Sequence, residues 1–375
     1  MGQYNIEVVK TIMIYSNFED IKIAGLSVAV PEKEVNVDSF NSAFGEEQVS
    51  KFKKMVGVER FRVAKTVQTA SDLCFVAARD LLDAKKIDKD TIGALMFVTQ
   101  TPDYKLPATA CVLHKRLGLS KNCLAYDINL GCSGYVYGLQ TLFALMQTSN
   151  IRRALLLVGD TMSKILSTED RSAAMLFGDA GSATLLEKNE EALPVNFACR
   201  TDGKGYRAII TQGGACRNPS ASTLKTEWGD GNVRSECDLF MNGVDVFNFT
   251  ISEVPTLIKE FMTKENSISE NYDYFVMHQA NLFILKQIAK KLKVPTEKVP
   301  VSLDEFGNTS SASIPITIAK LYKETALTDK ANKFLLAGFG VGLSWAITSI
   351  MLSPEAVLPI ITSDEHYLDG GILHG

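Results

Sequence analysis

The sequence lacks the features that mark several common classes of protein. It has no stretch of about 20 apolar residues that could span a bilayer. Its formal net charge is only −4, which gives no global attraction to nucleic acid or to an anionic membrane. The N-terminal run IEVVKTIMIYS is short and is interrupted by Lys10, so we expect no signal peptide. These absences predict a cytoplasmic protein that binds neither a membrane nor nucleic acid.

Residues that form disulfides or bind metals are also sparse. The seven cysteines include no Cys-x-x-Cys pair and follow no regular spacing. Such a set is typical of reduced thiols in a cytosol rather than of disulfides or zinc ligands. We therefore expect no metal site and no bound cofactor. Of the four histidines, His114, His366 and His374 lie in contexts that suggest no site.

The apolar strands of the chain repeat. LMFVTQT (95–101) lines up with YFVMHQA (274–280), and RALLLVGD (153–160) lines up with NKFLLAGF (332–339). From 95 to 274 and from 153 to 332 the separation is the same, 179 residues. A common separation predicts an internal duplication of an α/β unit, although buried strands can also look alike by chance.

A chain of 375 residues with 46% hydrophobic residues can hold two domains with large cores. We expect the first half at residues 21–190 and the second at 191–352. Residues 1–20 and 353–375 would be extensions whose composition suggests no function. Residues 211–238, rich in Gly, Ser, Asn and Asp, are interpreted as a loop excursion near a substrate entrance or as a plain surface loop.

Cys132 lies where the apolar stretch LAYDINLG meets a long helical pattern. The Gly-Cys-Ser-Gly turn between them would aim the thiol from a strand-to-helix turn, with its sulfur at the positive end of the helix dipole. A thiolate is favoured there, and thiolates attack thioesters. The alternative is a buried structural cysteine.

Two other segments suggest partners for this thiol. His278 ends the apolar run YDYFVM, and Asn308 stands in a Gly-Asn-Thr-Ser turn that caps a helix. A thiol, an imidazole and a carboxamide at the ends of elements would converge on one cleft. The pattern predicts a Cys-His-Asn enzyme, with a core histidine bonded to a backbone carbonyl as the alternative for His278.

With these segments in place, residues 21–352 resemble the β-ketoacyl-acyl-carrier-protein synthases of type III (KAS III), in the thiolase superfamily of condensing enzymes. The motifs that carry the resemblance are DINLGCSG, DRSAAMLFGDAGSA, MNGVDVF, HQANL, GNTSSASIP and GFGVGLSW. The resemblance implies an α/β protein with the thiolase fold, five-layered α/β/α/β/α, built from two pseudo-symmetric halves.

The resemblance also implies the reaction and the partners. Cys132 would take an acyl group from a thioester, while His278 and Asn308 would hold the enolate oxygen of a decarboxylating malonyl thioester. The backbone N–H groups of Cys132 and of a residue at or beside Val341, where the family commonly has glycine, would form an oxyanion hole. The partners would be acyl carrier protein, an acyl-CoA or other acyl-thioester primer, and a second copy of the chain in a homodimer.

The sequence departs from the family near the substrate entrance. Arg171 matches an arginine that helps to hold the adenine of coenzyme A, but Lys51 and Met55 replace the expected tryptophan and arginine. The sequence therefore lacks part of the set of residues that holds the adenine of coenzyme A in the family. Phe283 stands where an arginine usually meets the carrier protein, and Lys286 either takes over that role or belongs to a solvated helix face.

Leu106 occupies a position that is often a bulky aromatic at the end of the acyl tunnel, reached from the partner subunit. A smaller aliphatic residue there could admit a longer acyl chain.

Other enzymes fit the sequence less well. Type III polyketide synthases share the triad but match HQANL and GNTSSASIP less closely, and degradative thiolases need a second cysteine, whereas none follows Cys237. The GFGVG run precedes a strand-like segment, which argues against a dinucleotide fingerprint. A KAS III-like acyltransferase that forms an ester or amide, and an inactive partner subunit of a heterodimeric synthase, remain as alternatives.

Overall fold

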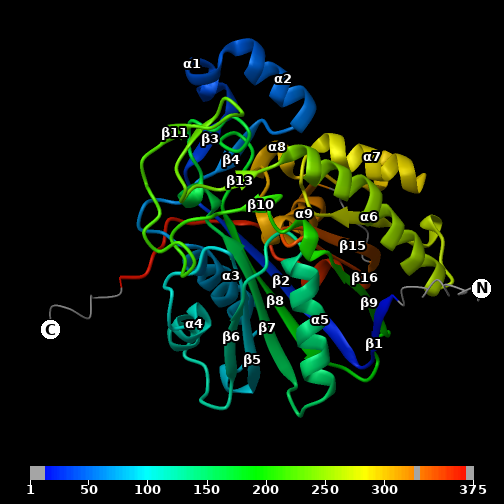
Figure 1. The fold of residues 1–375 in the computed structure, drawn as a ribbon. Helices are drawn as coiled ribbons and strands as arrows, with labels where there is room; N and C mark the ends of the chain where they lie inside the picture. Colours follow the sequence, from blue (N-terminus) through cyan, green and yellow to red (C-terminus); the bar gives the residue numbers. More distant parts are fainter. Residues whose placement is uncertain (1–12, 325–329, 369–375) are drawn as a thin grey trace, which may run out of the picture.

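The computed structural model describes residues 13–324 and 330–368, in which two central sheets are covered by helices (Figure 1). In the described residues, the first sheet has the strand order β17-β2-β8-β7-β5-β6 and the second has the order β1-β9-β16-β15-β14. The strands of the first sheet are β2 (Ile21–Val30), β5 (Ile92–Val98), β6 (Leu124–Ile128), β7 (Arg153–Asp160), β8 (Ala180–Lys188) and β17 (Ile361–Thr362). Those of the second are β1 (Ile14–Phe18), β9 (Val195–Thr201), β14 (Tyr274–Met277), β15 (Asn332–Gly340) and β16 (Ser344–Leu352).

Helices form three further layers around and between the sheets. The helices α5 (Gly134–Gln147) and α9 (Ser313–Glu324) lie between the sheets and contact strands of both. Helices α3 (Ala70–Ala84) and α4 (Thr109–Leu117) cover the outer face of the first sheet. Helices α6 (Gly243–Lys264) and α7 (Leu282–Leu292) cover the outer face of the second sheet. The five layers α/β/α/β/α are those that the resemblance to the KAS III enzymes implies.

Shorter strands and α-helices lie mostly at the ends of the sheets (Figure 1). They are β3 (Glu34–Asn36), α1 (Asn41–Phe44), α2 (Glu46–Val56), β4 (Arg60–Arg62), β10 (Ile209–Ile210), β11 (Thr226–Glu227), β12 (Val233–Arg234), β13 (Phe240–Met241) and α8 (Leu303–Phe306). None of the helices in residues 13–324 and 330–368 is both long and apolar enough to cross a membrane.

The sequence of α5 explains its central position. The helix GYVYGLQTLFALMQ contains no charged residue, as expected for a helix that is buried on more than one side. Gly138 lets it approach the first sheet closely, because a Cβ at this position would lie 2.7 Å from Leu156 Cδ1. The N-terminus of α5, where Cys132 stands, is thereby fixed between the sheets.

The predicted duplication is confirmed by the topology. The order β2-β8-β7-β5 in the first sheet matches β9-β16-β15-β14 in the second. The neighbours β5 and β7 are parallel, and so are β14 and β15. Helix α5 begins at residue 134 and α9 at residue 313, again 179 residues apart.

Strands from both predicted extensions complete the sheets. Strand β1, within residues 1–20, pairs antiparallel with β9 of the second sheet. Strand β17, within residues 353–375, pairs in parallel with β2 of the first sheet. Each sheet is therefore extended by a strand from the opposite end of the chain, which the boundaries drawn from the sequence do not anticipate.

Residues 211–238 contain the hairpin of β11 and β12, which is held to the body of the protein by a buried ion pair. Arg234 is fully buried, and its Nε lies 2.9 Å from Asp170 Oδ2. Its guanidinium also lies over the ring of Trp228, 4.9 Å from the centroid. The segment predicted as a loop excursion is irregular over most of its length and contains this short anchored hairpin.

Candidate active site

Cys132 lies in the turn between β6 and α5, as the sequence predicts. Helix α5 begins at Gly134 with Ser133 as its N-cap, and the side chain of Cys132 is buried. The turn β15–β16 packs directly on it, since a Cβ at Gly340 would lie 2.7 Å from Cys132 Cβ. Only glycine leaves room for the thiol at this contact.

His278 follows β14 directly and is buried beside the second sheet. Its backbone N–H donates to Ala337 O at 2.8 Å. Its Nδ1 lies 2.8 Å from the hydroxyl of Ser313, the first residue of α9. The ring also meets Phe339 edge-on, with centroids 5.4 Å apart. The backbone of Ser310 also interacts with the ring. These contacts fix the imidazole, and within residues 13–324 and 330–368 Nε2 makes no side-chain hydrogen bond.

Asn308 is held by its backbone and by its side-chain oxygen. Its N–H donates to Leu176 O at 2.8 Å, and its carbonyl accepts from Gly178 N at 3.1 Å. Its Oδ1 accepts a hydrogen bond from Ser310 N at 2.9 Å. Because the oxygen is engaged, the carboxamide NH₂ is the part of the side chain that remains to donate.

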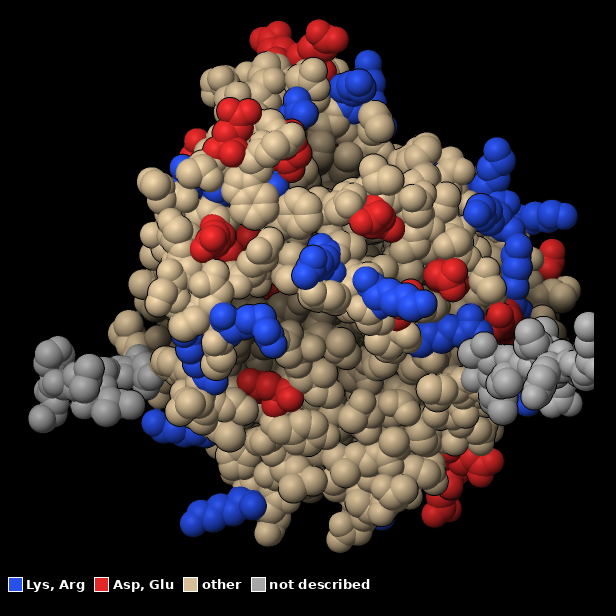
Figure 2. Space-filling view, in the orientation of Figure 1, with Lys and Arg blue, Asp and Glu red and all other residues tan. Residues whose placement is uncertain are grey.

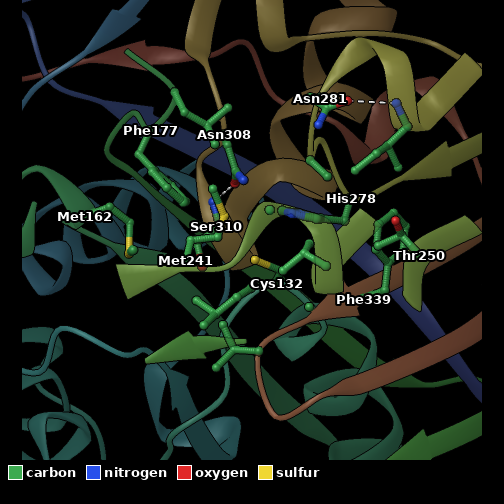
Figure 3. A pocket seen from close by; sticks show the side chains of 18 of the residues that line it. Cys132, Met162, Phe177, Met241, Thr250, His278, Asn281, Asn308, Ser310 and Phe339 are labelled. Carbon is green, nitrogen blue, oxygen red and sulfur yellow. Dashed lines mark hydrogen bonds between the residues drawn. The ribbon is translucent and has the colours of Figure 1, made fainter. Parts of the chain in front are cut away.

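The three side chains line one cavity of about 100 Å³ (Figure 3). Most of the other lining residues are apolar, among them Met162, Leu176, Phe177, Ile209, Leu239, Met241, Val246, Phe247, Ile284 and Phe339. Val341 lines the cavity as well, and its backbone N–H, like that of Cys132, interacts with the Cys132 sulfur. The structure thus brings together the residues of the predicted triad and of the predicted oxyanion hole.

Burial keeps both titratable members of the triad uncharged. It raises the pKa of the Cys132 thiol to about 12, with a further contribution from the negative charge of Asp160. It lowers the pKa of His278 to about 3. The expectation that the helix dipole yields a thiolate is wrong for the resting site, because desolvation outweighs the dipole.

Comparison with known proteins identifies the family. Residues 126–203 match the profile described as 3-oxoacyl-[acyl-carrier-protein (ACP)] synthase III, and residues 262–352 match that of its C-terminal part. A putative 3-oxoacyl-[acyl-carrier-protein] synthase 3 from Campylobacter jejuni is 34% identical over 342 residues, which are 88% of this chain and 93% of that protein. A β-ketoacyl-[acyl-carrier-protein] synthase III from Clostridium perfringens is 32% identical over 89% of this chain and 100% of that protein. The chain belongs to the 3-oxoacyl-[acyl-carrier-protein] synthase III family.

A solved structure shows the same architecture. The crystal structure of a 3-oxoacyl-(acyl-carrier protein) synthase from Burkholderia xenovorans is 39% identical to this chain and matches it with a TM-score of 0.85. The match covers 94% of this chain and 99% of that one. The resemblance drawn from the motifs and the predicted thiolase fold are both confirmed.

The remaining residues predicted for this synthase III site lie outside the cavity lining. Arg171 and Lys286 are exposed, and Leu106 is 82% exposed. Phe283 is also exposed, but its ring stacks on Phe247, which does line the cavity, with centroids 5.6 Å apart. Phe283 is thus separated from the cavity by the side chain of Phe247. The substrate-binding roles of all four residues remain predictions.

Charged side chains of both signs border a hollow in the surface of this synthase III member (Figure 2). Figure 2 shows Lys and Arg side chains on more than one side of a hollow near the centre of that face. The predicted excursion begins after Ile209 and ends before Met241, and both of these residues line the cavity. The excursion of residues 211–238 therefore begins and ends beside the cavity.

Two polar residues that were not predicted also belong to the site. Asp160, at the end of β7, is fully buried and its charge acts on the Cys132 thiol. Ser310 lines the cavity beside Cys132 (Figure 3). A lone carboxylate that ends an otherwise apolar strand, RALLLVGD, was the available signal for Asp160, whereas a serine in a serine-rich turn carries none.

Proposed function

We propose that the protein is a condensing enzyme that joins an acyl primer to malonyl-acyl-carrier protein, with loss of CO₂, in fatty acid or related biosynthesis. The observation that carries this proposal is the convergence of Cys132, His278 and Asn308 on one buried, mostly apolar cavity. Family membership supports it.

In the first half-reaction, Cys132 takes the acyl group from a thioester. The backbone N–H groups of Cys132 and Val341 reach the sulfur and can donate to the oxyanion that forms on the attacked carbonyl. Exchange of one thioester for another leaves the acyl group in a reactive form on the enzyme. The apolar lining of the cavity suits an acyl chain.

In the second half-reaction, His278 and Asn308 hold the enolate. With the pKa of His278 lowered to about 3 by burial, the imidazole is neutral at physiological pH. Ser313 Oγ accepts from Gln279 N–H at 3.4 Å, so its own hydrogen can go to His278 Nδ1, and Nε2 then carries a hydrogen to donate. The Asn308 NH₂ supplies the second donor. The enolate carbon attacks the acyl group on Cys132 and releases the thiolate.

We further propose that the enzyme is a homodimer that acts with acyl carrier protein in the cytoplasm. Free cysteines fit a reducing compartment. The basic side chains around the hollow in Figure 2 suit an acidic or phosphorylated partner. Leu106 is 82% exposed in one chain, as fits a residue that enters the tunnel of a partner subunit.

The test uses the purified protein with a short acyl thioester and malonyl-acyl-carrier protein. We expect mass spectrometry to show the acyl mass on Cys132, followed by equal amounts of CO₂ and β-ketoacyl product. Transfer of the acyl group to an alcohol or amine without CO₂ would instead identify an ester- or amide-forming acyltransferase. No acylation with any thioester would indicate an inactive partner subunit.

A further inference from the structure

The Cys132 thiol must lose its proton when it is acylated, and His278 is poorly placed to take it. The imidazole is buried, and in the described residues no carboxylate forms an ion pair with it that would stabilise an imidazolium. Its Nδ1 is already engaged by the Ser313 hydroxyl. A neutral histidine suits the donor role in the second half-reaction, so the first half-reaction needs another proton acceptor.

Asp160 provides a carboxylate directly beside the thiol. It is fully buried, and Oδ1 accepts from Gln100 N at 2.7 Å and from Thr99 Oγ1 at 3.2 Å. Its Oδ2 accepts from Ser311 Oγ at 3.3 Å. These donors come from the end of β5 and from the turn that carries Asn308, so the carboxylate is fixed where the two halves of the protein meet. The negative charge of Asp160 is close enough to raise the pKa of the Cys132 thiol, after the larger effect of burial.

Ser310 neighbours both the thiol and the carboxylate. Its hydroxyl is buried and, among the residues that the structure describes, has no hydrogen-bond partner of good geometry. It nevertheless lies close enough to interact with both Cys132 and Asp160. The backbone holds it there in the left-handed region, at φ +50°, a conformation that is unfavourable for serine and is retained only when surrounding contacts impose it. The hydroxyl can accept a proton from one neighbour and donate to the other.

We propose that Asp160 accepts the Cys132 proton through the Ser310 hydroxyl during acylation and returns it after condensation. This inference rests on the proposed function, because it assigns the proton transfers of the two half-reactions. It adds a buried base to a site in which the triad itself supplies a nucleophile and two hydrogen-bond donors.

The proton balance closes over the cycle. On acylation the Cys132 S–H bond breaks, Ser310 takes that proton and passes its own to Asp160, and the new S–C bond forms. The departing thiolate of the primer takes a proton from solvent. On condensation the S–C bond breaks, the electron pair returns to the Cys132 sulfur, and the proton stored on Asp160 returns through Ser310. Asp160 and Cys132 are therefore never negatively charged at the same time.

The acid–base properties of the site support proton transfer to Asp160 rather than to His278. Burial raises the pKa of Asp160 to about 6, whereas burial lowers the pKa of His278 to about 3. The carboxylate is therefore the stronger base. Two thiols face it, Cys132 from the turn before α5 and Cys74 from α3, and burial also raises the pKa of Cys74. In the described part of the chain no lysine or arginine forms an ion pair with Asp160. Acylation should accordingly slow as the pH falls through about 6, where Asp160 becomes protonated.

The experiment measures the two half-reactions separately in the full-length protein. Acylation of Cys132 by a short acyl thioester is followed by mass spectrometry, and decarboxylation of a malonyl thioester is followed by CO₂ release. We expect Asp160→Asn and Ser310→Ala each to slow acylation by about 10²-fold or more, the usual contribution of a positioned base. Decarboxylation should remain nearly unchanged, and the loss of acylation rate near pH 6 should disappear in Asp160→Asn.

Ser311→Ala is the matched control, because it removes one hydrogen bond to the same carboxylate but leaves the relay intact. Its acylation should fall much less than that of Ser310→Ala. Equal losses in the two serine variants, equal losses in both half-reactions, or wild-type acylation in Asp160→Asn would overturn the proposal. If Asp160→Asn does not fold, the acylation and decarboxylation rates of Ser310→Ala alone test the proposal. Failure of the wild-type protein to acylate would refute the proposed function instead.

Discussion

Gly340 and Cys132 are in such close contact that a Cβ on the glycine would lie 2.7 Å from Cys132 Cβ and 3.1 Å from its sulfur. The first distance is too short for a real Cβ and the second is unusually tight, so the end of β15 and the turn that follows it determine where the thiol can stand. The same turn carries the Val341 N–H that reaches the sulfur. The contact between Gly340 and Cys132 therefore positions both the nucleophilic thiol and the Val341 N–H that donates to the oxyanion.

This contact predicts that Gly340→Ala displaces the thiol. Acylation should fall by about 10²-fold, because a misplacement of about 1 Å can cost that much. Decarboxylation should be affected less, since His278 and Asn308 lie on other segments. Gly203→Ala is the matched control, because nothing lies within 4 Å of its Cβ position. Wild-type acylation rates in Gly340→Ala would show that the contact can relax.

Substitutions in the triad should separate the half-reactions. Cys132→Ala should abolish acylation and condensation but retain decarboxylation of a malonyl thioester. His278→Ala and Asn308→Ala should form acyl-Cys132 and then stall, because loss of one oxyanion donor typically costs about 10²- to 10³-fold in rate. The acyl-enzyme is measured by mass and decarboxylation by CO₂ release. Normal condensation in Asn308→Ala would contradict its assignment.

Much of this arrangement could be predicted from the sequence, but its protonation state could not. The repeat, Cys132, His278 and Asn308 were visible as motifs at the ends of apolar runs. The resting thiol was missed because burial is a property of the assembled halves, and the local pattern around Cys132 shows only the helix that follows. Ser310 was missed for a related reason, since its position beside Cys132 and Asp160 exists only when the halves pack together.

Leu106 should influence which primers the enzyme accepts. The residue is 82% exposed in one chain and would enter the tunnel of its partner in the predicted homodimer. Leu106→Phe should therefore shift acylation of Cys132 toward shorter acyl chains, as measured with thioesters of increasing length. Leu224→Phe, at a residue that is 73% exposed, is the control. A fully active monomer in sedimentation experiments would exclude this role for Leu106.

The nucleotide of coenzyme A should contribute little to binding. Lys51 and Met55 replace the expected tryptophan and arginine, and Arg171 is exposed. A stacked cation–aromatic contact contributes roughly 0.5 to 2 kcal/mol, which is about 2- to 30-fold in affinity. A pantetheine thioester or an acyl-carrier protein should thus acylate Cys132 within about tenfold of the matching acyl-CoA. Acylation hundreds of times faster from acyl-CoA would mean that other residues hold the nucleotide.

The exchange of edge strands also has a consequence for how the protein matures on the ribosome. Residues 14–18 emerge early but cannot pair until residues 195–201 have been made. The edge of β2 that pairs with β17 has no partner strand until residues 361–362 have been synthesised. The first sheet therefore cannot be finished when its own half of the chain has been synthesised, so an open edge prone to wrong pairing persists until residues 361–362 are made. A nascent chain of this kind is one that would benefit from a chaperone until synthesis is complete.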